Sequence, residues 1–398
     1  MKIGILTFHR SYNYGAFMQC FSLLKKLSKD FPDINFEIID YNAKKIVDGY
    51  AKWVNAIQDE GIKQRIEERN VLFDKCQEQL PLSQFKLVGD DHSSLIEHMN
   101  KTYDAVIVGS DAVWNWATRG FPNPYFLKDY KGIKLSYAAS VHGMVYQNMT
   151  QEQKEYLQEA FADFRYIGVR DTATENMVHY VCPDLKVYHN CDPTVLLDLN
   201  DVPCDKDKLK IKLEKHGVDF SKPLIGMMAG ASVGYEIKKH FGKKIQLVSV
   251  YEPNPYADVY LHDLTPFEWA YVFSFFKTTA THFFHGTLLT LVNHKPVTSI
   301  EFESTYSAVN TTKIKDVLTR LGLLQWRFSA DYRNDSIVKK VMKKYHLWSD
   351  KKLWAGVIRH IDDTIENDYS ELVSSRMAEE AKSYLSFKEA LENIKKDF

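Results

Sequence analysis

The sequence contains no apolar run that approaches the roughly 20 residues a membrane span needs. The apolar stretch Met1–His9 is short and soon interrupted, so we interpret it as a buried strand and not as a signal peptide. Cysteine is scarce, with five residues, an odd number without zinc-like pairing. This usage is typical of a reducing cytoplasm and not of a disulfide framework or a metal site. We therefore expect a cytoplasmic protein that holds no metal.

An excess of charge of either sign is also missing. The formal net charge is −1, with 51 basic and 52 acidic residues, so no global field draws the chain to nucleic acid. Hydrophobic residues make up 45% and charged residues 26% of the 398 residues, an ordinary balance for a globular protein. The length is sufficient for about two or three domains. We find no internal repeat and no low-complexity tract.

Glycine is sparse in the first strand–helix loop, residues 9–15, which follows a predicted strand over 2–7. The loop has one glycine, whereas the dinucleotide-binding fingerprint needs three at fixed spacing. The loop still brings Asn13 and Tyr14 to the carboxyl end of a strand, where we expect contacts to an acceptor sugar or an anion. The alternative is an ordinary turn in which Asn13 caps the next helix.

Strand and helix patterns alternate along the chain and predict an α/β fold of two successive units with a cleft between them. A polar stretch without β-rich runs separates the units, and a charged, helical pattern closes the chain. Within the first unit, residues 42–102 lack a clear strand pattern, so we expect them to form a partly helical excursion from the sheet. The expected boundaries are an N-terminal domain over 1–200 (excursion 42–102), a linker over 201–222, a C-terminal domain over 223–335 and a helical tail over 336–398.

An uninterrupted apolar run, Tyr103–Asp111, predicts a strand buried on both faces at the centre of a parallel sheet. Its end carries Ser110 and Asp111, and Trp114 and Asn115 follow within a few residues. Polar groups beside a large aromatic ring suit a sugar, which stacks its apolar face and offers hydroxyls. We expect these four residues to contact an acceptor sugar. The alternative is a tight turn that Trp114 packs against the core.

Arg170 ends another predicted strand, over 166–170, and stands directly before a predicted helix. An arginine at the carboxyl end of a strand, beside a helix N-terminus, is a strong ligand for carboxylate or phosphate. We expect it to bind an anionic substrate. The alternative is an ion pair with Asp171 or Glu175.

The stretch from Thr278 to Val297 predicts a strand through Phe284, a helix from Gly286 and a further strand. His285 then stands at the carboxyl end of a strand, where parallel sheets bind ligands. The amides of a helix that begins at Gly286 would favour an anion there. An imidazole beside an anion is a plausible general acid. The alternative is a structural histidine followed by a turn glycine.

Taken in order, several short motifs resemble the polysaccharide pyruvyl transferase family. The resemblance covers residues 1 to about 325. The motifs are specific for the family and not for a substrate. They are Ile3–His9 with Asn13–Ala16 and Gln19, Phe73 with Leu80–Ser83, Val108–Asn115, Ser136–Ser140, Gly168–Arg170, Asp192–Thr194, and Phe284–Thr287 with Lys295 and Pro296.

The resemblance implies a GT-B-like fold, with two Rossmann-like domains and an active site between them. It also implies transfer of the enolpyruvyl group of phosphoenolpyruvate to a sugar of a surface polysaccharide or of its lipid- or nucleotide-linked precursor. The product is a pyruvate ketal, and no cofactor is required beyond phosphoenolpyruvate as co-substrate. His285 takes the place of the family's general acid or base, and Arg170 that of a phosphoenolpyruvate ligand. The amides of Gly286 and Thr287 are expected to assist in donor binding.

The chain departs from the family pattern just before His285. The family commonly has Thr-Asp-Ser there, whereas this chain has His282 and Phe283 after Thr281. Other members carry an arginine where Phe283 stands. The usual glutamine after Gly-Ser-Asp is Ala112 here. We expect His282 to lie on the same face of the strand as His285 and to replace a lost contact to the donor.

Two other functions stay open. One is a GT-B glycosyltransferase that uses a nucleotide sugar. The candidate carboxylate for binding the ribose of that nucleotide is Glu301 or Glu303. The other is a carbohydrate-binding member of the family without catalysis.

A peripheral contact with the inner face of a membrane is a further expectation, because the acceptors of such enzymes are often lipid-linked. The segment from Tyr41 to Trp53 combines Lys44, Lys45, Lys52, Tyr50 and Trp53. The alternative is an insertion packed on its own domain.

Overall fold

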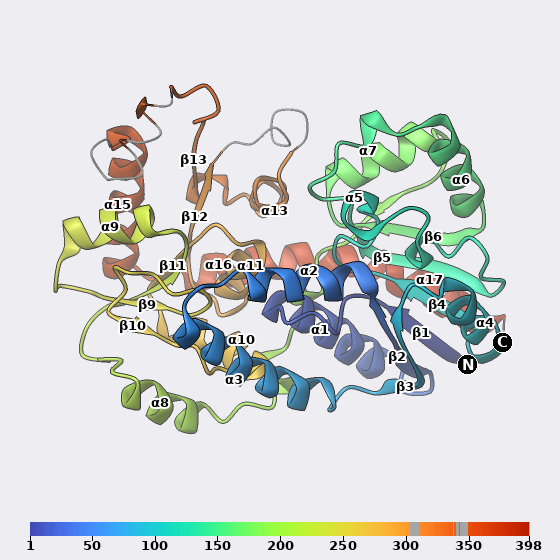
Figure 1. Cartoon of the computed structure of the whole chain (residues 1–398), viewed down its shortest axis with the longest axis horizontal. Coiled ribbons are helices and arrows are strands. Elements are labelled where there is room, and N and C mark those ends of the chain that lie inside the picture. The colour runs from blue at the N-terminus through green and yellow to red at the C-terminus, as the bar shows by residue number, and fades with distance from the viewer. Residues whose placement is uncertain (303–310, 337, 340–341, 343–348, 398) are drawn as a thin grey trace. The chain divides into compact units, whose positions relative to one another are not determined.

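The computed structural model describes residues 1–302, 311–336, 338–339, 342 and 349–397 (Figure 1). Two compact units divide the chain. Unit 1 contains Met1–Leu197 together with Ala381–Phe398, and unit 2 contains Asp198–Glu380. The final helix of the chain therefore belongs to the first unit.

Unit 1 is built on a parallel sheet of seven strands in the order β3-β2-β1-β4-β5-β6-β7. The central strands are continuous apolar runs because helices cover both of their faces. Every residue of β4 is fully buried, which confirms the central strand that the sequence predicts there. The strands are β1 (Lys2–Leu6), β2 (Asn35–Ala43), β3 (Leu82–Gly89), β4 (Ala105–Val108), β5 (Ile133–Ala139), β6 (Phe164–Val169) and β7 (Tyr188–His189).

The helices of unit 1 begin at side-chain caps that the sequence provides. Asn13 accepts a hydrogen bond from the amide of Ala16 at the start of the first helix, and Asp171 caps another helix through Thr174. In the last helix Phe387 is buried and packs its ring 5.0 Å from that of Tyr137. The helices are α1 (Tyr14–Asp30), α2 (Lys44–Asn55), α3 (Glu60–Gln77), α4 (His92–Thr102), α5 (Trp116–Arg119), α6 (Gln151–Ala162), α7 (Thr172–Val181) and α17 (Leu385–Lys396).

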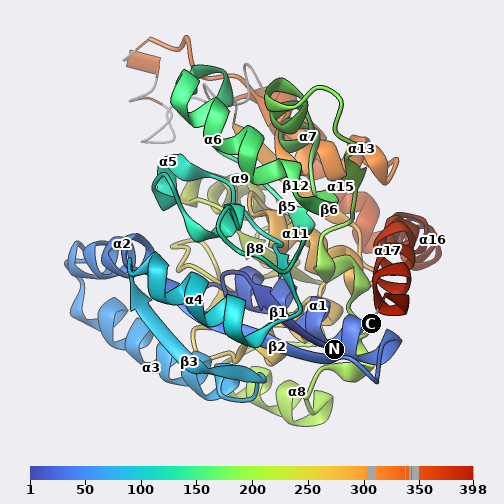
Figure 2. The ribbon, with the colours of Figure 1, turned by 90° about the vertical axis from the view of Figure 1, so that its right-hand side faces the viewer.

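The prediction that residues 42–102 leave the sheet is wrong for β3. This strand pairs in parallel with β2, with Leu87 opposite Tyr41, and forms the edge of the sheet. Figure 2 shows α2, α3 and α4 around this edge. Edge strands are half exposed and rich in polar residues, so β3 lacks the apolar run by which the central strands are recognised.

Unit 2 contains a second parallel sheet, of six strands, in the order β10-β9-β8-β11-β12-β13. Apolar residues of β8, β11 and β12 form one core with Val357 and Ile361 from a helix on one face of the sheet. The strands are β8 (Leu224–Met228), β9 (Gln246–Ser249), β10 (Val259–Tyr260), β11 (Thr278–Thr281), β12 (Val297–Phe302) and β13 (Arg327–Ala330).

The helices of unit 2 include a capping box that the sequence predicts. Thr265 and Glu268 exchange hydrogen bonds, with Pro266 in the first helical turn. Residues 201–222, expected as a linker, contain a helix whose Leu209 and Leu213 are buried. The helices are α8 (Lys206–Lys215), α9 (Ala231–Phe241), α10 (Pro266–Val272), α11 (Phe284–Val292), α13 (Lys313–Arg320), α15 (Lys351–Glu366) and α16 (Ser370–Ala381).

The helical tail that the sequence predicts is present, and its helices divide between the units: α15 and α16 pack in unit 2 and α17 packs on β6 in unit 1. Within the described ranges, no helix combines the length and the apolar composition that crossing a bilayer requires.

Candidate active site

Arg170 stands at the carboxyl end of β6, where its amide donates to Ala139 O of β5 at 3.1 Å. The residue is only 1% exposed. Its Nη1 donates to Asp192 Oδ2 at 2.8 Å, and its Nη2 lies 3.9 Å from Asp111 Oδ1. Burial lowers the pKa of Arg170, but the surrounding carboxylates outweigh it and hold the pKa above its ordinary value. Arg170 is therefore a permanent buried cation.

The ion pair of Arg170 differs from the alternative that the sequence suggests. Its partner is Asp192, which follows β7, and neither Asp171 nor Glu175. Asp171 instead accepts hydrogen bonds from Ser140 Oγ at 2.5 Å and Thr174 Oγ1 at 2.6 Å. Burial raises the pKa of Asp171, but Arg170 and these two hydroxyls hold it below its ordinary value. Three carboxylates thus surround one guanidinium.

Ser110 is part of a closed hydrogen-bond network and does not face a ligand. Its hydroxyl donates to Gln19 Oε1, and Gln19 Nε2 donates to Thr7 Oγ1 at 3.0 Å. Thr7 Oγ1 in turn donates to the carbonyl of Ser110 at 3.0 Å. All three side chains are fully buried, so the network ties β1, α1 and the end of β4 together. The expected acceptor contact of Ser110 is wrong for this reason.

Trp114 is a core residue, and the prediction that it stacks on a sugar is wrong. It is fully buried, and its indole N–H donates to Tyr125 O at 3.0 Å. Three rings surround it, at centroid distances of 5.0 to 6.3 Å. They belong to Phe126, Phe161 and Phe164. The alternative considered from the sequence, a turn packed by this tryptophan, is what the structure contains.

The other expected acceptor residues fall into two groups. Tyr14 is buried, with its ring 4.6 Å from that of Phe73, and Asn115 is buried and donates to the carbonyl of His142 at 2.6 Å. Asn13 is exposed but caps α1. Asp111 keeps a side chain that is 17% exposed. Asn13 and Asp111 are therefore the acceptor candidates of unit 1 that solvent reaches.

His285 lies in the first turn of α11, one residue inside the helix. The sequence predicts a strand through residue 284, but β11 ends at Thr281 because the Thr281 hydroxyl accepts from the amide of Phe283 at 2.9 Å. The first helical hydrogen bond runs from Thr287 N to Phe283 O at 3.0 Å. His285 is partly exposed near the carboxyl end of a central strand, and its Nε2 is buried.

Gly286 and Thr287 fix the position of α11. A Cβ on Gly286 would lie 2.6 Å from Thr281 Oγ1 and 2.9 Å from Met228 Sδ, so only glycine permits this approach. Thr287 is buried, and its hydroxyl pairs with Ser299 Oγ at 2.9 Å. Because its amide already donates to Phe283 O, the expected anion contact of Thr287 is wrong.

His282 is exposed in the turn between β11 and α11, and its amide donates to Met228 O at 3.2 Å. The expected strand relationship between His282 and His285 does not hold, because the strand ends before the first of them. The imidazole of His282 lies against Phe283, with ring centroids 4.2 Å apart.

Sequence reasoning missed two groups at the carboxyl edge of unit 1. His9 Nε2 donates to Asp40 Oδ1 at 3.0 Å, and Arg10 forms a two-pronged pair with the same carboxylate. Burial raises the pKa of Asp40, but hydrogen bonds from Arg10 and His9 outweigh it and hold the pKa well below its ordinary value. Arg119 lies over the ring of Phe8 at 4.1 Å. His9 and Arg10 follow β1 and Arg119 follows β4, and this position was the available signal, whereas Asp40 lies within β2.

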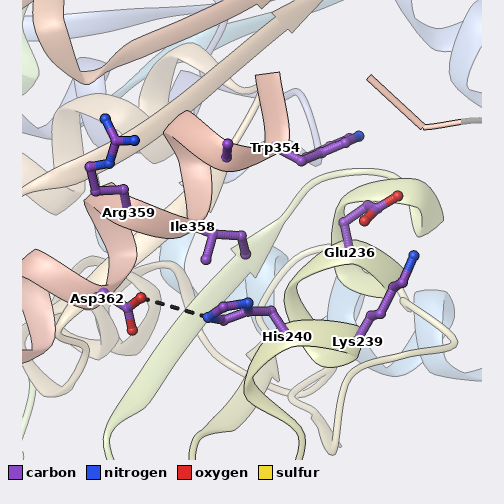
Figure 3. A pocket seen from close by; sticks show the side chains of 8 residues that line it. Glu236, Lys239, His240, Trp354, Ile358, Arg359 and Asp362 are labelled. Carbon is purple, nitrogen blue, oxygen red and sulfur yellow. Dashed lines mark ion pairs between the residues drawn. The ribbon is translucent and has the colours of Figure 1, made fainter. Parts of the chain in front are cut away.

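A groove in unit 2 lies between α9 and α15 (Figure 3). Its volume is about 610 Å³, with Trp354 and Ile358 of α15 as apolar lining. His240 of α9 faces Asp362 of α15, with 3.6 Å between Nε2 and Oδ2. Both helices lie against one face of the sheet, so the groove is separate from the carboxyl edge that holds His285. Over the described ranges, no group of three or more His, Cys, Asp or Glu side chains is arranged to hold a metal ion.

The two parallel α/β sheets and the helical carboxyl-terminal segment define a fold of the GT-B class. UDP-GlcNAc 2-epimerase from Neisseria meningitidis is similar in structure, with a TM-score of 0.54 at 10% identity over 99% of this chain and 100% of that chain. The putative UDP-N-acetylglucosamine 2-epimerase from Listeria monocytogenes gives a TM-score of 0.51 at 10% identity, over 100% of this chain and 97% of that chain. At such identities the likeness concerns the fold alone.

The family follows from the sequence comparison. A family model described as "Polysaccharide pyruvyl transferase" matches residues 13–304, which is more than half of the chain. The chain belongs to the polysaccharide pyruvyl transferase family. No curated protein matches the sequence.

Proposed function

We propose that the chain transfers the pyruvyl group of phosphoenolpyruvate to two hydroxyls of a sugar, forming a ketal. The acceptor belongs to a surface polysaccharide or to its lipid- or nucleotide-linked precursor. The observation that carries the proposal is the family match over residues 13–304. The partly exposed imidazole of His285, in the first turn of α11, supplies a group suited to the chemistry.

In the proposed reaction His285 gives a proton to the methylene carbon of phosphoenolpyruvate. The central carbon then becomes oxocarbenium-like, and one sugar hydroxyl adds to it while its proton returns to the imidazole. The second hydroxyl displaces phosphate, which leaves with the second hydroxyl proton. Two C–O bonds form, one C–O bond to phosphate breaks, and the methylene becomes a methyl group. No oxidant or reductant is needed.

The donor carries a carboxylate and a phosphate, so its binding calls for cations. Arg170 is a buried cation at the carboxyl end of β6, although one of its nitrogens is committed to Asp192. Arg119, which lies over Phe8, has no ion-pair partner within the described part of the chain, and its Nε is buried without a hydrogen-bond partner there. We assign Arg170 and Arg119 to the donor. The amide of Gly286 remains a further candidate.

The test incubates the chain with phosphoenolpyruvate and a panel of glycans, and measures released phosphate and product mass. Replacing His285→Ala should lower the rate by about 10²–10⁴-fold, the usual effect of removing a general acid. The exposed His240→Ala, in the separate groove, is the control and should keep the wild-type rate. Neither phosphate nor a pyruvylated product from the wild type would contradict the proposal.

The glycosyltransferase alternative has less support. Its candidate ribose ligand Glu301 already accepts from Arg327 Nε at 2.5 Å and from Thr312 Oγ1 at 3.0 Å. Glu303 lies outside the described residues. Thermal stabilisation by a nucleotide diphosphate and not by phosphoenolpyruvate would favour this alternative. Sugar binding without turnover, unchanged in His285→Ala, would favour a non-catalytic member.

We also propose a cytoplasmic location with peripheral contact to a membrane. The helix α2 carries Lys44, Lys45 and Lys52, and its Trp53 is 47% exposed. Such a combination of lysines and an exposed tryptophan suits an anionic lipid surface.

A further inference from the structure

Three aromatic rings gather at the carboxyl edge of the sheet in unit 2. The rings of Tyr251 and Phe283 lie 5.0 Å apart in an edge-to-face arrangement. The imidazole of His282 lies 4.2 Å from the ring of Phe283, at an angle of 35°. His282 is exposed, and the other two are partly exposed. We call these three residues the aromatic cluster.

Backbone contacts hold the aromatic cluster in place from two segments. Tyr251 follows β9, and His282 and Phe283 follow β11, the two strands on either side of β8. The amide of His282 donates to Met228 O at the end of β8, and the amide of Phe283 donates to the hydroxyl of Thr281. The cluster therefore lies across the carboxyl end of β8, where a parallel sheet binds ligands.

The chemistry of this surface differs from that of an anion site. Phenyl and phenol rings offer no cation to a carboxylate or a phosphate. They do offer apolar faces that stack on the C–H bonds of a sugar ring, and the neighbouring imidazole of His282 can exchange hydrogen bonds with hydroxyls. Pockets that combine a few polar groups with aromatic walls are typical of small neutral ligands.

His285 stands two residues after Phe283, in the first turn of α11. The ring of Phe284, between them in sequence, is buried and lies beneath Lys313, with 5.0 Å between Nζ and the ring centroid. The aromatic cluster and the imidazole of His285 are thus the partly exposed groups of this short turn. The ring of His285 packs edge-on against that of Phe284, with centroids 5.3 Å apart, so the cluster and His285 are linked through this short turn.

We propose that the aromatic cluster binds the acceptor sugar, a neutral hexopyranoside with axial C–H bonds on one face. The proposal rests on the proposed function for the identity of the reaction, and it moves His282 from the donor to the acceptor. Phe283 supplies the stacking face, Tyr251 supports that ring from its edge, and His282 holds a hydroxyl. The acceptor hydroxyls that react are then those nearest to His285.

The test measures sugar affinity separately from turnover, by saturation-transfer NMR and calorimetry with the full chain. The probes are methyl β-D-galactopyranoside, methyl β-D-glucopyranoside and methyl α-D-mannopyranoside, without phosphoenolpyruvate. Phe283→Ala should lower the affinity for the sugar about tenfold, which corresponds to about 1.4 kcal/mol of binding free energy. Phe283→Trp should retain the affinity, because it keeps an aromatic face. Tyr180→Ala removes an exposed ring of unit 1 and should leave the affinity unchanged.

Thermal melts and circular dichroism identify any variant that fails to fold. If Phe283→Ala does not fold, the sugar affinity of Tyr251→Ala is measured in its place. Equal affinity of the wild type and Phe283→Ala, or no binding of any probe to the wild type, overturns the acceptor site. Phosphoenolpyruvate-dependent phosphate release is measured on the same samples. Sugar binding that depends on Phe283 without phosphate release supports the site and contradicts the proposed reaction. Phosphate release with sugar binding that is independent of Phe283 overturns the site alone.

Discussion

The carboxyl edges of the two sheets are built from different side chains. In unit 1 the edge is charged: the buried Arg170 pairs with Asp192, and the partly buried Arg10 pairs with Asp40. In unit 2 the edge presents partly exposed rings, with Phe283 between Tyr251 and His282. Buried charges depend on their partners, whereas exposed rings keep a face for a ligand. In the proposed reaction the first edge binds the anionic donor and the second binds the neutral acceptor.

The charged edge should be the more fragile of the two. Asp192→Ala leaves the cation of Arg170 buried without its nearest carboxylate, and should lower the free energy of unfolding by about 3–5 kcal/mol. Urea unfolding followed by tryptophan fluorescence measures the change. Asp48→Ala removes an exposed partner of Lys44 and should cost no more than about 1 kcal/mol. Equal losses in the two variants would show that Asp192 is not needed to hold Arg170.

The turn between β11 and α11, which carries two residues of the aromatic cluster, requires Gly286 to pack closely against neighbouring residues. Gly286→Ala brings a Cβ against Thr281 and Met228, so it should destabilise unit 2 by about 1–3 kcal/mol in the same unfolding measurement. Gly49→Ala is the control, because nothing lies within 4 Å of a Cβ there and Gly49 is inside α2. It should stabilise the chain by about 0.5–1 kcal/mol. A neutral Gly286→Ala would contradict the packing described for α11.

Lowering the pH should destabilise the folded chain by protonating Asp40 at the charged edge. The pKa of Asp40 is lower in the folded chain than its ordinary value, because the hydrogen bonds from Arg10 and His9 outweigh the effect of burial. The carboxylate of Asp40 therefore makes its full contribution to the free energy of unfolding above about pH 3.9, the pKa of an aspartate in the unfolded chain. This contribution is lost as the pH falls from there toward the lower pKa of the folded chain. Unfolding curves between pH 5 and pH 2 should show a steeper loss for the wild type than for Asp40→Asn, with the difference developing below about pH 4. Parallel pH profiles would contradict this role of Asp40.

The smallest effect concerns α2 at the edge of unit 1. Trp53→Ser should reduce the fraction bound to vesicles of phosphatidylglycerol by a few-fold, in a sedimentation assay at low salt. Tyr180→Ser, another exposed ring, should leave that fraction unchanged. Binding to uncharged phosphatidylcholine vesicles that equals binding to anionic ones would contradict a role for the lysines of α2.

Much of the fold could be predicted from the sequence because central parallel strands are continuous apolar runs. The strands around β4, β5 and β8 follow this pattern. The sequence did not reveal β3, an edge strand with alternating exposure, or the short β10 and β13. Such strands are defined by their neighbours in the sheet, and local patterns do not contain that information.

The places of the candidate residues in the fold were predictable, and their contacts were less so. His285 lies near the expected strand end, because strand–turn–helix patterns are local. The partner of Arg170 was not predictable, since Asp192 is 22 residues away and arrives through the pairing of β6 with β7. The same holds for Trp114, whose aromatic neighbours Phe161 and Phe164 are about 50 residues away in the sequence.

The most direct measurement is a crossed binding experiment with phosphoenolpyruvate and a neutral hexopyranoside. Calorimetry compares Arg119→Ala, at the charged edge, with Phe283→Ala, at the aromatic edge. If the charged edge binds phosphoenolpyruvate and the aromatic edge binds the sugar, Arg119→Ala lowers the affinity for phosphoenolpyruvate about tenfold or more and leaves the affinity for the sugar unchanged. Phe283→Ala then lowers the affinity for the sugar and leaves that for phosphoenolpyruvate unchanged. Loss of phosphoenolpyruvate binding in Phe283→Ala, with full binding in Arg119→Ala, would contradict this division.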